Sequence, residues 1–389
     1  MKIRSALIAG AAAFVIVLVS SHLRATPFNN YVLLADAFLH GHAWINWPGP
    51  YIDALLYNGQ HYIIEAPLPA LLLLPAVAIF GTAVSQTLLA ALLAAVAIGA
   101  AWELTERLGV ARRASIWLCI FLLAGTDLLW CAMLGDVWFI AHVSAVCFTL
   151  LALVELTGKR RGWLVAVWAA CAIESRFSLA LALPAYAYLL ALPQSEEPFL
   201  FRDARARLIG FAAILIPIGL LWVGYNELRW GTFGDIGYTA WYHQDAAGMP
   251  YGSPFQLQYL PYQLYSFFVQ LPTFTPSYPY VRPEIVGIAL TWTSPALVLA
   301  FLARRPSRLV IAFWAATILV AAPSFVYYVN GFSQFGMRHA LDFEPFLFAL
   351  MALGVRAGFP IWGRVLVAYS AVVGVWGVWF WNAIVRAGS

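Results

Sequence analysis

The sequence predicts an all-α, polytopic membrane protein with about 11 transmembrane crossings. Its 389 residues are 63% hydrophobic and only 10% charged, and the mean hydropathy is +0.80, values outside the range of soluble globular domains. Apolar runs of nearly bilayer-spanning length recur along the chain, separated by short basic segments. The net charge of +4 is small and dispersed, so we expect no nucleic-acid partner.

The apolar runs are the candidate helices, because a crossing helix needs roughly 20 residues. All 4 cysteines lie inside these runs without metal-ligand spacing, which predicts small core residues rather than disulfides. The first run has a basic start and also fits a cleaved signal peptide, although a retained first helix would serve the same targeting role. In chain order the runs cover residues 5–21, 66–81, 84–104, 115–134, 137–156, 162–175, 177–192, 208–224, 285–303, 309–327, 343–355 and 361–381.

The basic residues decide the orientation, because Lys and Arg near span ends stay cytoplasmic. If residues 66–81 do not cross, all but six of the 22 basic residues lie inside, whereas a crossing there inverts the bias. The run contains Pro67, Pro69 and Pro75, so we predict a re-entrant or surface-lying helix and a cytoplasmic amino end. The six basic residues left outside are Arg24, Arg176, Arg229, Arg282, Arg338 and Arg386.

The same orientation gathers the polar chemistry on one side of a multi-pass cell-membrane protein. The two long loops, 22–65 and about 225–284, all 7 histidines and most acidic residues fall on or near the outer face. We therefore predict a single transmembrane domain over residues 1–389 whose active face is extracytoplasmic. Membrane lipids are its expected surroundings.

The first outer loop has predicted structure of its own. Thr26 is placed as an N-cap, Pro27 as the first helical residue and Gly41 as the stop of an interfacial helix. Asp36 and His40 are i, i+4 neighbours on that helix, with a second histidine at 42. This group is open to two interpretations, a metal site or a polar face at the membrane surface, and we expect no metal because a complete ligand set is missing.

A hairpin is predicted after this helix, around Asn58-Gly59, a favoured type I′ turn pair. The hairpin holds Asp53 and Glu65 near its two ends. An acid fixed at the membrane interface has its pKa raised by desolvation and can act as a general base. In the structural alternative, Asp53 caps the hairpin or pairs with Arg338.

The later outer segments add aromatic residues and a second basic site. Residues 255–271 alternate aromatic and polar groups, as in an amphipathic surface helix, and such aromatic walls suit sugars or a prenyl chain. In the segment GFSQFGMRHALDFEPFLF, Arg338 sits where a span begins. Arg338 can grip a phosphate with two donors, or it can neutralise Asp342 at i+4.

Together these loops resemble the C-type glycosyltransferases, the polytopic enzymes that use lipid-phosphate sugars. IDALLYNGQHYIIEAPLPALLLLP resembles the family's hairpin stretch, AHVSAV and AIESRFSLALALP resemble two later motifs, and FGMRHALDFEPFL resembles its arginine-containing end. The sequence departs from the family pattern at two places: Glu65 stands where many relatives have Lys, and Asn29-Asn30 replace an acid after the first span.

The resemblance implies transfer of a sugar from a polyprenyl-phosphate donor to a hydroxyl of a glycan, lipid or protein acceptor, with no cofactor. Asp53 is the preferred catalytic base and Asp36 the second candidate. Two rival functions remain: a transporter or flippase of a lipid-linked sugar, and a catalytically inactive subunit that binds sugar lipids. The residues predicted to bind the donor phosphate or sugar are Arg338, His142, Arg176, Tyr62, His61, Glu65 and Asp136.

Overall fold

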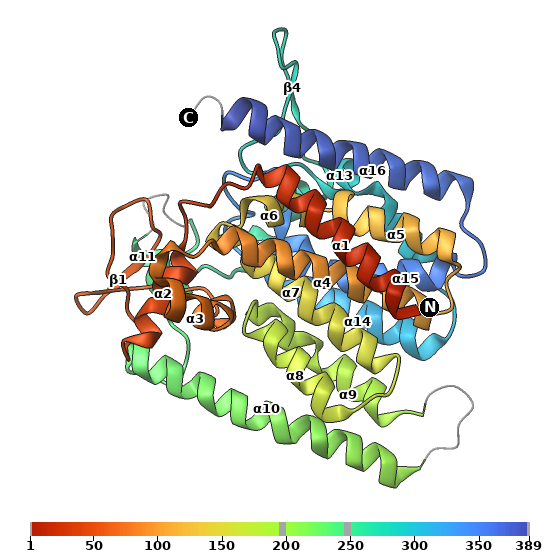
Figure 1. The fold of residues 1–389 in the computed structure, drawn as a ribbon, viewed down its shortest axis with the longest axis horizontal. Coiled ribbons are helices and arrows are strands. Elements are labelled where there is room, and N and C mark those ends of the chain that lie inside the picture. The colour runs from red at the N-terminus through yellow and green to blue at the C-terminus, as the bar shows by residue number, and fades with distance from the viewer. Residues whose placement is uncertain (1, 194–199, 245–249, 387–389) are drawn as a thin grey trace.

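The computed structural model describes residues 2–193, 200–244 and 250–386, which form a bundle of roughly aligned helices (Figure 1). Within these residues, 6 helices are long and apolar enough to cross a membrane, and a pair bent by 50° raises the number to 7. The long helices are α1 (Lys2–Ser21), α4 (Gln86–Arg107), α7 (Val137–Leu156), α10 (Phe201–Trp230), α14 (Ser307–Phe325) and α16 (Ile361–Phe380), and the bent pair is α5 (Arg112–Ala124) with α6 (Leu128–Leu134).

Shorter apolar segments complete the bundle and coincide with the remaining predicted runs. The all-α polytopic prediction is therefore confirmed, whereas the number of crossings stays a prediction, because these segments are shorter than a full span. They are α8 (Gly162–Ile173), η2 (Phe177–Ala182) continuing into α9 (Leu183–Ala191), α13 (Leu290–Thr293) followed by η4 (Pro295–Leu302), and α15 (Glu344–Val355).

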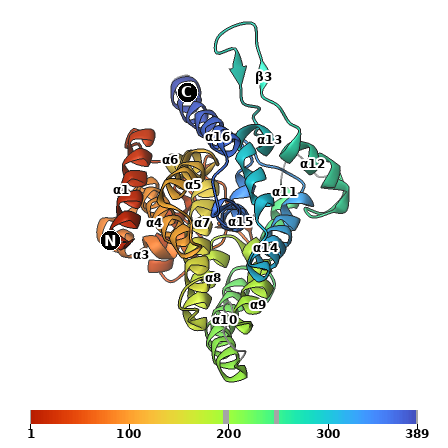
Figure 2. The ribbon, with the colours of Figure 1, turned by 90° about the vertical axis from the view of Figure 1, so that its right-hand side faces the viewer.

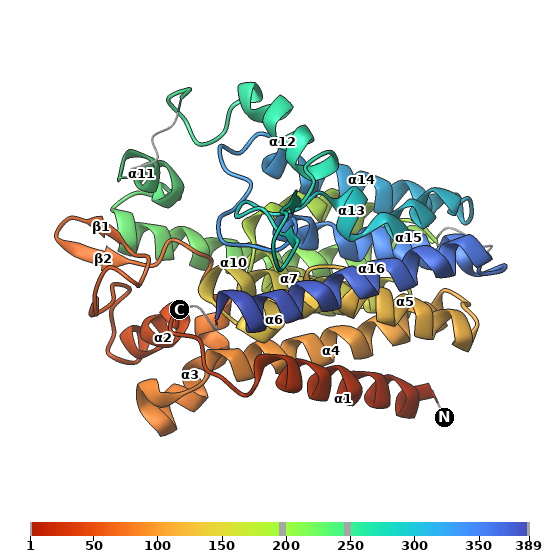
Figure 3. The ribbon, with the colours of Figure 1, turned by 90° about the horizontal axis from the view of Figure 1, so that it is seen from above.

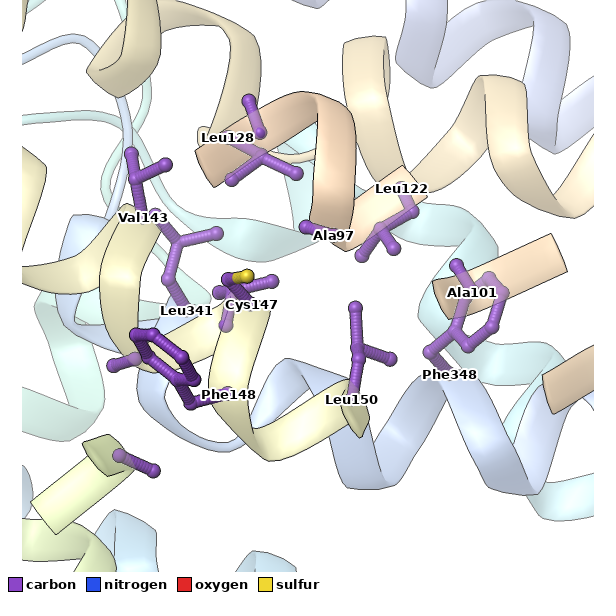
Figure 4. Packing of buried hydrophobic residues seen from close by; sticks show 14 of the residues in the cluster. Ala97, Ala101, Leu122, Leu128, Val143, Cys147, Phe148, Leu150, Leu341 and Phe348 are labelled. Carbon is purple, nitrogen blue, oxygen red and sulfur yellow. The ribbon is translucent and has the colours of Figure 1, made fainter. Parts of the chain in front are cut away.

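Helix α7 is the centre of the bundle and α10 its periphery. In α7, 83% of the most apolar window is buried inside the protein, against 6% for α10. Close packing around α7 comes from alanines, leucines and phenylalanines that interlock between α4, α5, α7 and α15 (Figure 4). Helices α1 and α4 approach so closely that a Cβ on Gly10 would lie 2.7 Å from the backbone oxygen of Ala95, which explains the glycine.

Residues 22–85 leave and re-enter the bundle at the same end. The backbone N–H of Thr26, just after α1, donates to Thr87 Oγ1 in the first turn of α4 at 3.1 Å. Helix α3 (Leu68–Phe80), interrupted by Pro75 and followed by η1 (Gly81–Ala83), lies beside α2 (Asn30–Leu39) at this end (Figure 3). That residues 66–81 do not cross the membrane stays a prediction.

Basic segments gather at the opposite end, hereafter the basic end. Arg107 at the close of α4 donates to the Val154 backbone oxygen near the end of α7 at 2.8 Å, and Arg207 at the start of α10 donates to Leu190 of α9 at 2.8 Å. The other end, which carries α2, α3 and the hairpin, is hereafter the loop end. The charge separation on which the predicted orientation depends is thus present in the fold.

The loop end carries the small elements. Strands β1 (Leu55–Tyr57) and β2 (Gln60–Tyr62) pair antiparallel, and the turn residues Asn58 and Gly59 have φ of 48° and 78°, which confirms the predicted type I′ hairpin. Helix α12 (Leu260–Phe268) confirms the predicted helix within 255–271. The second hairpin, formed by β3 (Thr273–Phe274) and β4 (Val281–Arg282), projects sideways from the bundle (Figure 2). The remaining elements are α11 (Gly237–Gln244), η3 (Leu257–Tyr259), η5 (Arg338–Asp342) and η6 (Trp381–Val385).

The predicted start of the first interfacial helix is wrong. Helix α2 begins at Asn30 rather than after Thr26. The Thr26 hydroxyl accepts from the Phe28 backbone N–H and donates to Asp136, so it ties the chain to the start of α7 instead of capping a helix. The predicted stop holds, because Gly41 follows the helix with a φ of 81° that favours glycine.

Candidate functional site

A cavity of about 700 Å³ lies at the loop end, where the connections between helices converge. Its walls come from the segment after the first hairpin, the start of α7, residues 175–181, the last third of α10, residues 235–241 and residues 323–339. Segments far apart in the sequence therefore share one wall. Among the predicted site residues, those that line this cavity are Asp53, Glu65, His142, Arg176 and Arg338.

The first hairpin carries Asp53 and Glu65 to the cavity together. Because Leu55 pairs with Tyr62, the residues just outside the two strands stay close to each other. The backbone on both sides is fixed: Asn30 Nδ2 donates to the Asp53 carbonyl at 2.8 Å, and Arg229 Nη1 donates to the Ile63 carbonyl at 3.3 Å. The sequence thus places two carboxyl groups on one rigid support.

Glu65 is the more deeply buried of the two, with 9% of its surface exposed. Its Oε2 has no hydrogen-bond partner among the described residues. Burial, and to a lesser extent the charge of Asp53, raise the pKa of Glu65 to about 7. A large fraction of Glu65 is therefore protonated at neutral pH.

A second polar group, centred on Asp342, forms beneath the cavity. The buried Asp342 carboxylate lies 2.7 Å from His142 Nδ1 and accepts from Ser178 Oγ at 2.8 Å and Arg176 Nε at 3.2 Å. Burial alone would raise the pKa of Asp342, but Arg176 and His142 hold it well below its usual range. Arg176 Nη2 also lies 3.2 Å from His339 Nδ1, so the Arg176 side chain is held in one orientation.

Arg338 has a different environment. Its Nη1 donates to Gln334 Oε1 at 2.7 Å and to the Phe332 carbonyl at 3.3 Å, and its guanidinium lies 5.4 Å from the centre of the Phe139 ring. No carboxylate of the described residues is within ion-pair distance, and burial lowers the pKa of Arg338 only to about 10. Arg338 is therefore a cation at the cavity without an ion-pair partner among the described residues. Pairing with Asp342 is excluded because Arg176 and His142 occupy that carboxylate.

The other four predicted residues lie away from the cavity wall. Asp36 faces His40 on α2 at 3.7 Å, where both side chains are solvent-accessible, and Asp136 accepts from the Thr26 hydroxyl. His61 stacks on Trp47 with ring centres 4.4 Å apart, and Tyr62 packs on Trp230 at 5.1 Å. Between Asp36 and Asp53, only Asp53 reaches the cavity. Within the described ranges, no group of three or more His, Cys, Asp or Glu side chains could hold a metal ion.

Sequence reasoning missed several cavity residues. His339 lines the cavity and belongs to the segment that contains Arg338, so its proximity to Arg338 was predictable. The long-range pairing of Asp342, outside the cavity lining, with Arg176 and His142 was not predictable. Of the aromatic wall, the sequence analysis indicated the 255–271 stretch, which contributes Phe255, whereas the other rings gave no signal beyond the general excess of aromatic residues. The wall consists of Trp138, Phe177, Trp222, Tyr238, Trp241, Phe255, Tyr327, Tyr328 and Phe332.

Comparison with known proteins identifies the fold. No family model matches the sequence, and none of the curated proteins matches it. Among solved structures, ArnT from Cupriavidus metallidurans, determined with undecaprenyl phosphate bound, superimposes with a TM-score of 0.53 at 16% identity over 88% of this chain. The match covers 58% of the ArnT chain. The protein therefore shares the fold of this ArnT structure, and the predicted all-α polytopic fold is confirmed.

Proposed function

We propose that this protein is a membrane glycosyltransferase that moves a sugar from a polyprenyl-phosphate donor to an acceptor hydroxyl at the loop-end cavity. The observation that carries the proposal is the meeting of Asp53 and Glu65 with the unneutralised Arg338 in one cavity. A base and an anion-binding group are the two requirements of this reaction. The ArnT structure adds support, because it holds undecaprenyl phosphate within the same fold.

In the proposed reaction, Asp53 accepts the proton of the acceptor hydroxyl as that oxygen attacks the anomeric carbon of the donor sugar. The bond between the anomeric carbon and the phosphate oxygen breaks, and its electron pair stays on the phosphate. Arg338, supported by Arg176, stabilises the charge that develops there. The products are the glycosylated acceptor and polyprenyl phosphate.

The cavity walls suit the remaining parts of both substrates. Aromatic rings such as Trp222 and Tyr238 line it, and rings of this kind pack against the apolar faces of sugars while excluding water. The Asp342 network holds Arg176 in place, so less ordering is required when an anion binds. The loop end is proposed to be extracytoplasmic because the basic end would then lie in the cytoplasm.

The test is transfer by the purified protein in nanodiscs from a radiolabelled polyprenyl-phosphate sugar. Release of polyprenyl phosphate is measured together with label in the acceptor, so that hydrolysis is detected when the acceptor is wrong. Turnover that is lost in Asp53→Asn and kept in the basic-end control Glu103→Gln supports the enzyme. Donor binding without turnover for any sugar would indicate a sugar-lipid-binding subunit, and label carried across the bilayer unchanged would indicate a flippase.

A further inference from the structure

The surroundings of Glu65 differ from those expected of a second catalytic base. It is nine-tenths buried, lines the cavity, and has one carboxyl oxygen without a partner among the described residues. A buried carboxylate in this condition is costly, whereas a buried carboxylic acid is tolerated and gains a donor. The side chain therefore has one hydrogen-bonding group reserved for a ligand.

Titratable and charged groups from several segments act on Glu65. Asp53 comes from the segment before the hairpin, Tyr31 from α2 and Tyr238 from α11, while Arg176 and Arg338 supply positive charge. Of the two acids, Asp53 is partly exposed and Glu65 is buried. When two carboxyl groups share a cavity, their titrations are coupled and the more deeply buried one keeps the proton.

We propose that Glu65 works as a neutral carboxylic acid that donates a hydrogen bond to a phosphate oxygen of the lipid-linked donor, while Asp53 is the ionised partner. The inference rests on the donor class of the proposed function. A phosphodiester offers only acceptors and a negative charge, so an ionised Glu65 would repel it and a protonated Glu65 binds it. The two acids of the hairpin thus divide the tasks of base and donor-holding group.

This role makes donor binding depend on pH in a defined direction. Below neutral pH Glu65 is protonated and donates, and as pH rises through about 7 the proton is lost and binding weakens. A phosphodiester keeps a single charge throughout this range, so its own ionisation does not contribute. The loss corresponds to about tenfold in affinity, the effect of one hydrogen bond to a charged group.

The experiment measures binding of a polyprenyl methyl phosphodiester to the full-length protein in nanodiscs between pH 5.5 and pH 8.5. We expect the wild type to bind about tenfold more weakly at the alkaline end. Glu65→Gln, whose amide donates at every pH, should show an affinity that does not change with pH. Glu65→Ala, which has no donor, should bind weakly throughout, and the basic-end control Glu103→Gln should follow the wild type.

Three results would overturn the inference: a wild-type affinity that is independent of pH, a Glu65→Gln protein that keeps the wild-type pH dependence, or equal binding by Glu65→Gln and Glu65→Ala. Thermal melting of each variant separates a binding defect from unfolding. Because binding is measured without turnover, absence of transfer would refute the proposed enzyme and leave this test intact.

Discussion

Replacing Arg338 by Gln tests whether the cavity binds an anion. Arg338 is 8% exposed, and it makes two hydrogen bonds from Nη1 and a ring contact with Phe139. None of these contacts is an ion pair, so the substitution breaks no buried salt bridge. Glutamine keeps an amide donor at a shorter reach, which limits the damage to the fold.

The size of the effect follows from the interactions that a bound phosphate would lose. A hydrogen bond to a charged group contributes about 1.5–3 kcal/mol, and removal of the positive charge from the buried site adds a loss of Coulomb attraction. We therefore expect donor binding to weaken by about 10- to 100-fold in Arg338→Gln. Arg338→Lys keeps the positive charge but lacks the planar two-donor geometry, so its affinity for the donor should lie between those of the wild type and Arg338→Gln.

The assay is binding of polyprenyl phosphate to purified protein in nanodiscs, combined with thermal melting. Arg282→Gln is the matched control, because Arg282 lies exposed on β4, away from the cavity lining. The reasoning is refuted if Arg338→Gln binds the lipid as tightly as wild type while its melting temperature is unchanged. Weaker binding accompanied by unfolding would instead make Arg338 a structural residue of the 332–338 loop.

The remaining predictions concern the base, the buried network and the topology. Asp53→Asn should lower turnover by about 10² to 10⁴ with folding intact, whereas Asp36→Asn, outside the cavity, should lower it much less. A larger loss of transfer in Asp36→Asn than in Asp53→Asn would contradict the assignment of Asp53 as the base. Asp342→Asn should lower the free energy of unfolding by about 3–5 kcal/mol, because Arg176 loses its buried partner, and unchanged melting would argue against this. In a cysteine-free variant, Lys159→Cys should react with an impermeant thiol reagent only after cells are opened and Thr232→Cys in intact cells; labelling of Lys159→Cys in intact cells would invert the orientation.

Much of the fold was predictable because the membrane limits the possible structures. Backbone groups in lipid must form their hydrogen bonds within helices. Hydropathy and the short basic segments between apolar runs were therefore enough to locate the helices. The hairpin was predictable for a local reason, since Asn58-Gly59 tolerates the positive φ of a type I′ turn. The helix start at Thr26 was not, because its hydroxyl is bound to Asp136, 110 residues away, and no local pattern reports such a contact.

The candidate site was predictable in part for the same reason. Asp53 and Glu65 flank a hairpin formed by neighbouring residues, so the hairpin pattern alone predicted that the same element holds both side chains. The lack of an ion pair at Arg338 could not be predicted. Asp342 at i+4 is the obvious local partner of Arg338, but in the structure the Asp342 carboxylate contacts Arg176 and His142 instead. A tertiary ion pair therefore determines which arginine is left with an uncompensated charge.

The charged groups of the cavity favour the movement of negative charge that the proposed reaction requires. Arg176 contacts Asp342, and Arg229 lies 3.6 Å from Asp235, whereas no described carboxylate lies within ion-pair distance of Arg338. With Glu65 protonated, the cavity carries one negative charge fewer, so the phosphodiester meets the Arg338 cation with less repulsion. Proton transfer to Asp53 removes one negative charge from the hairpin as the leaving phosphate gains one. The reaction then creates no net charge in the cavity and moves negative charge towards the Arg338 guanidinium, which forms no ion pair with a described carboxylate. This is the direction that electrostatic stabilisation of the transition state requires.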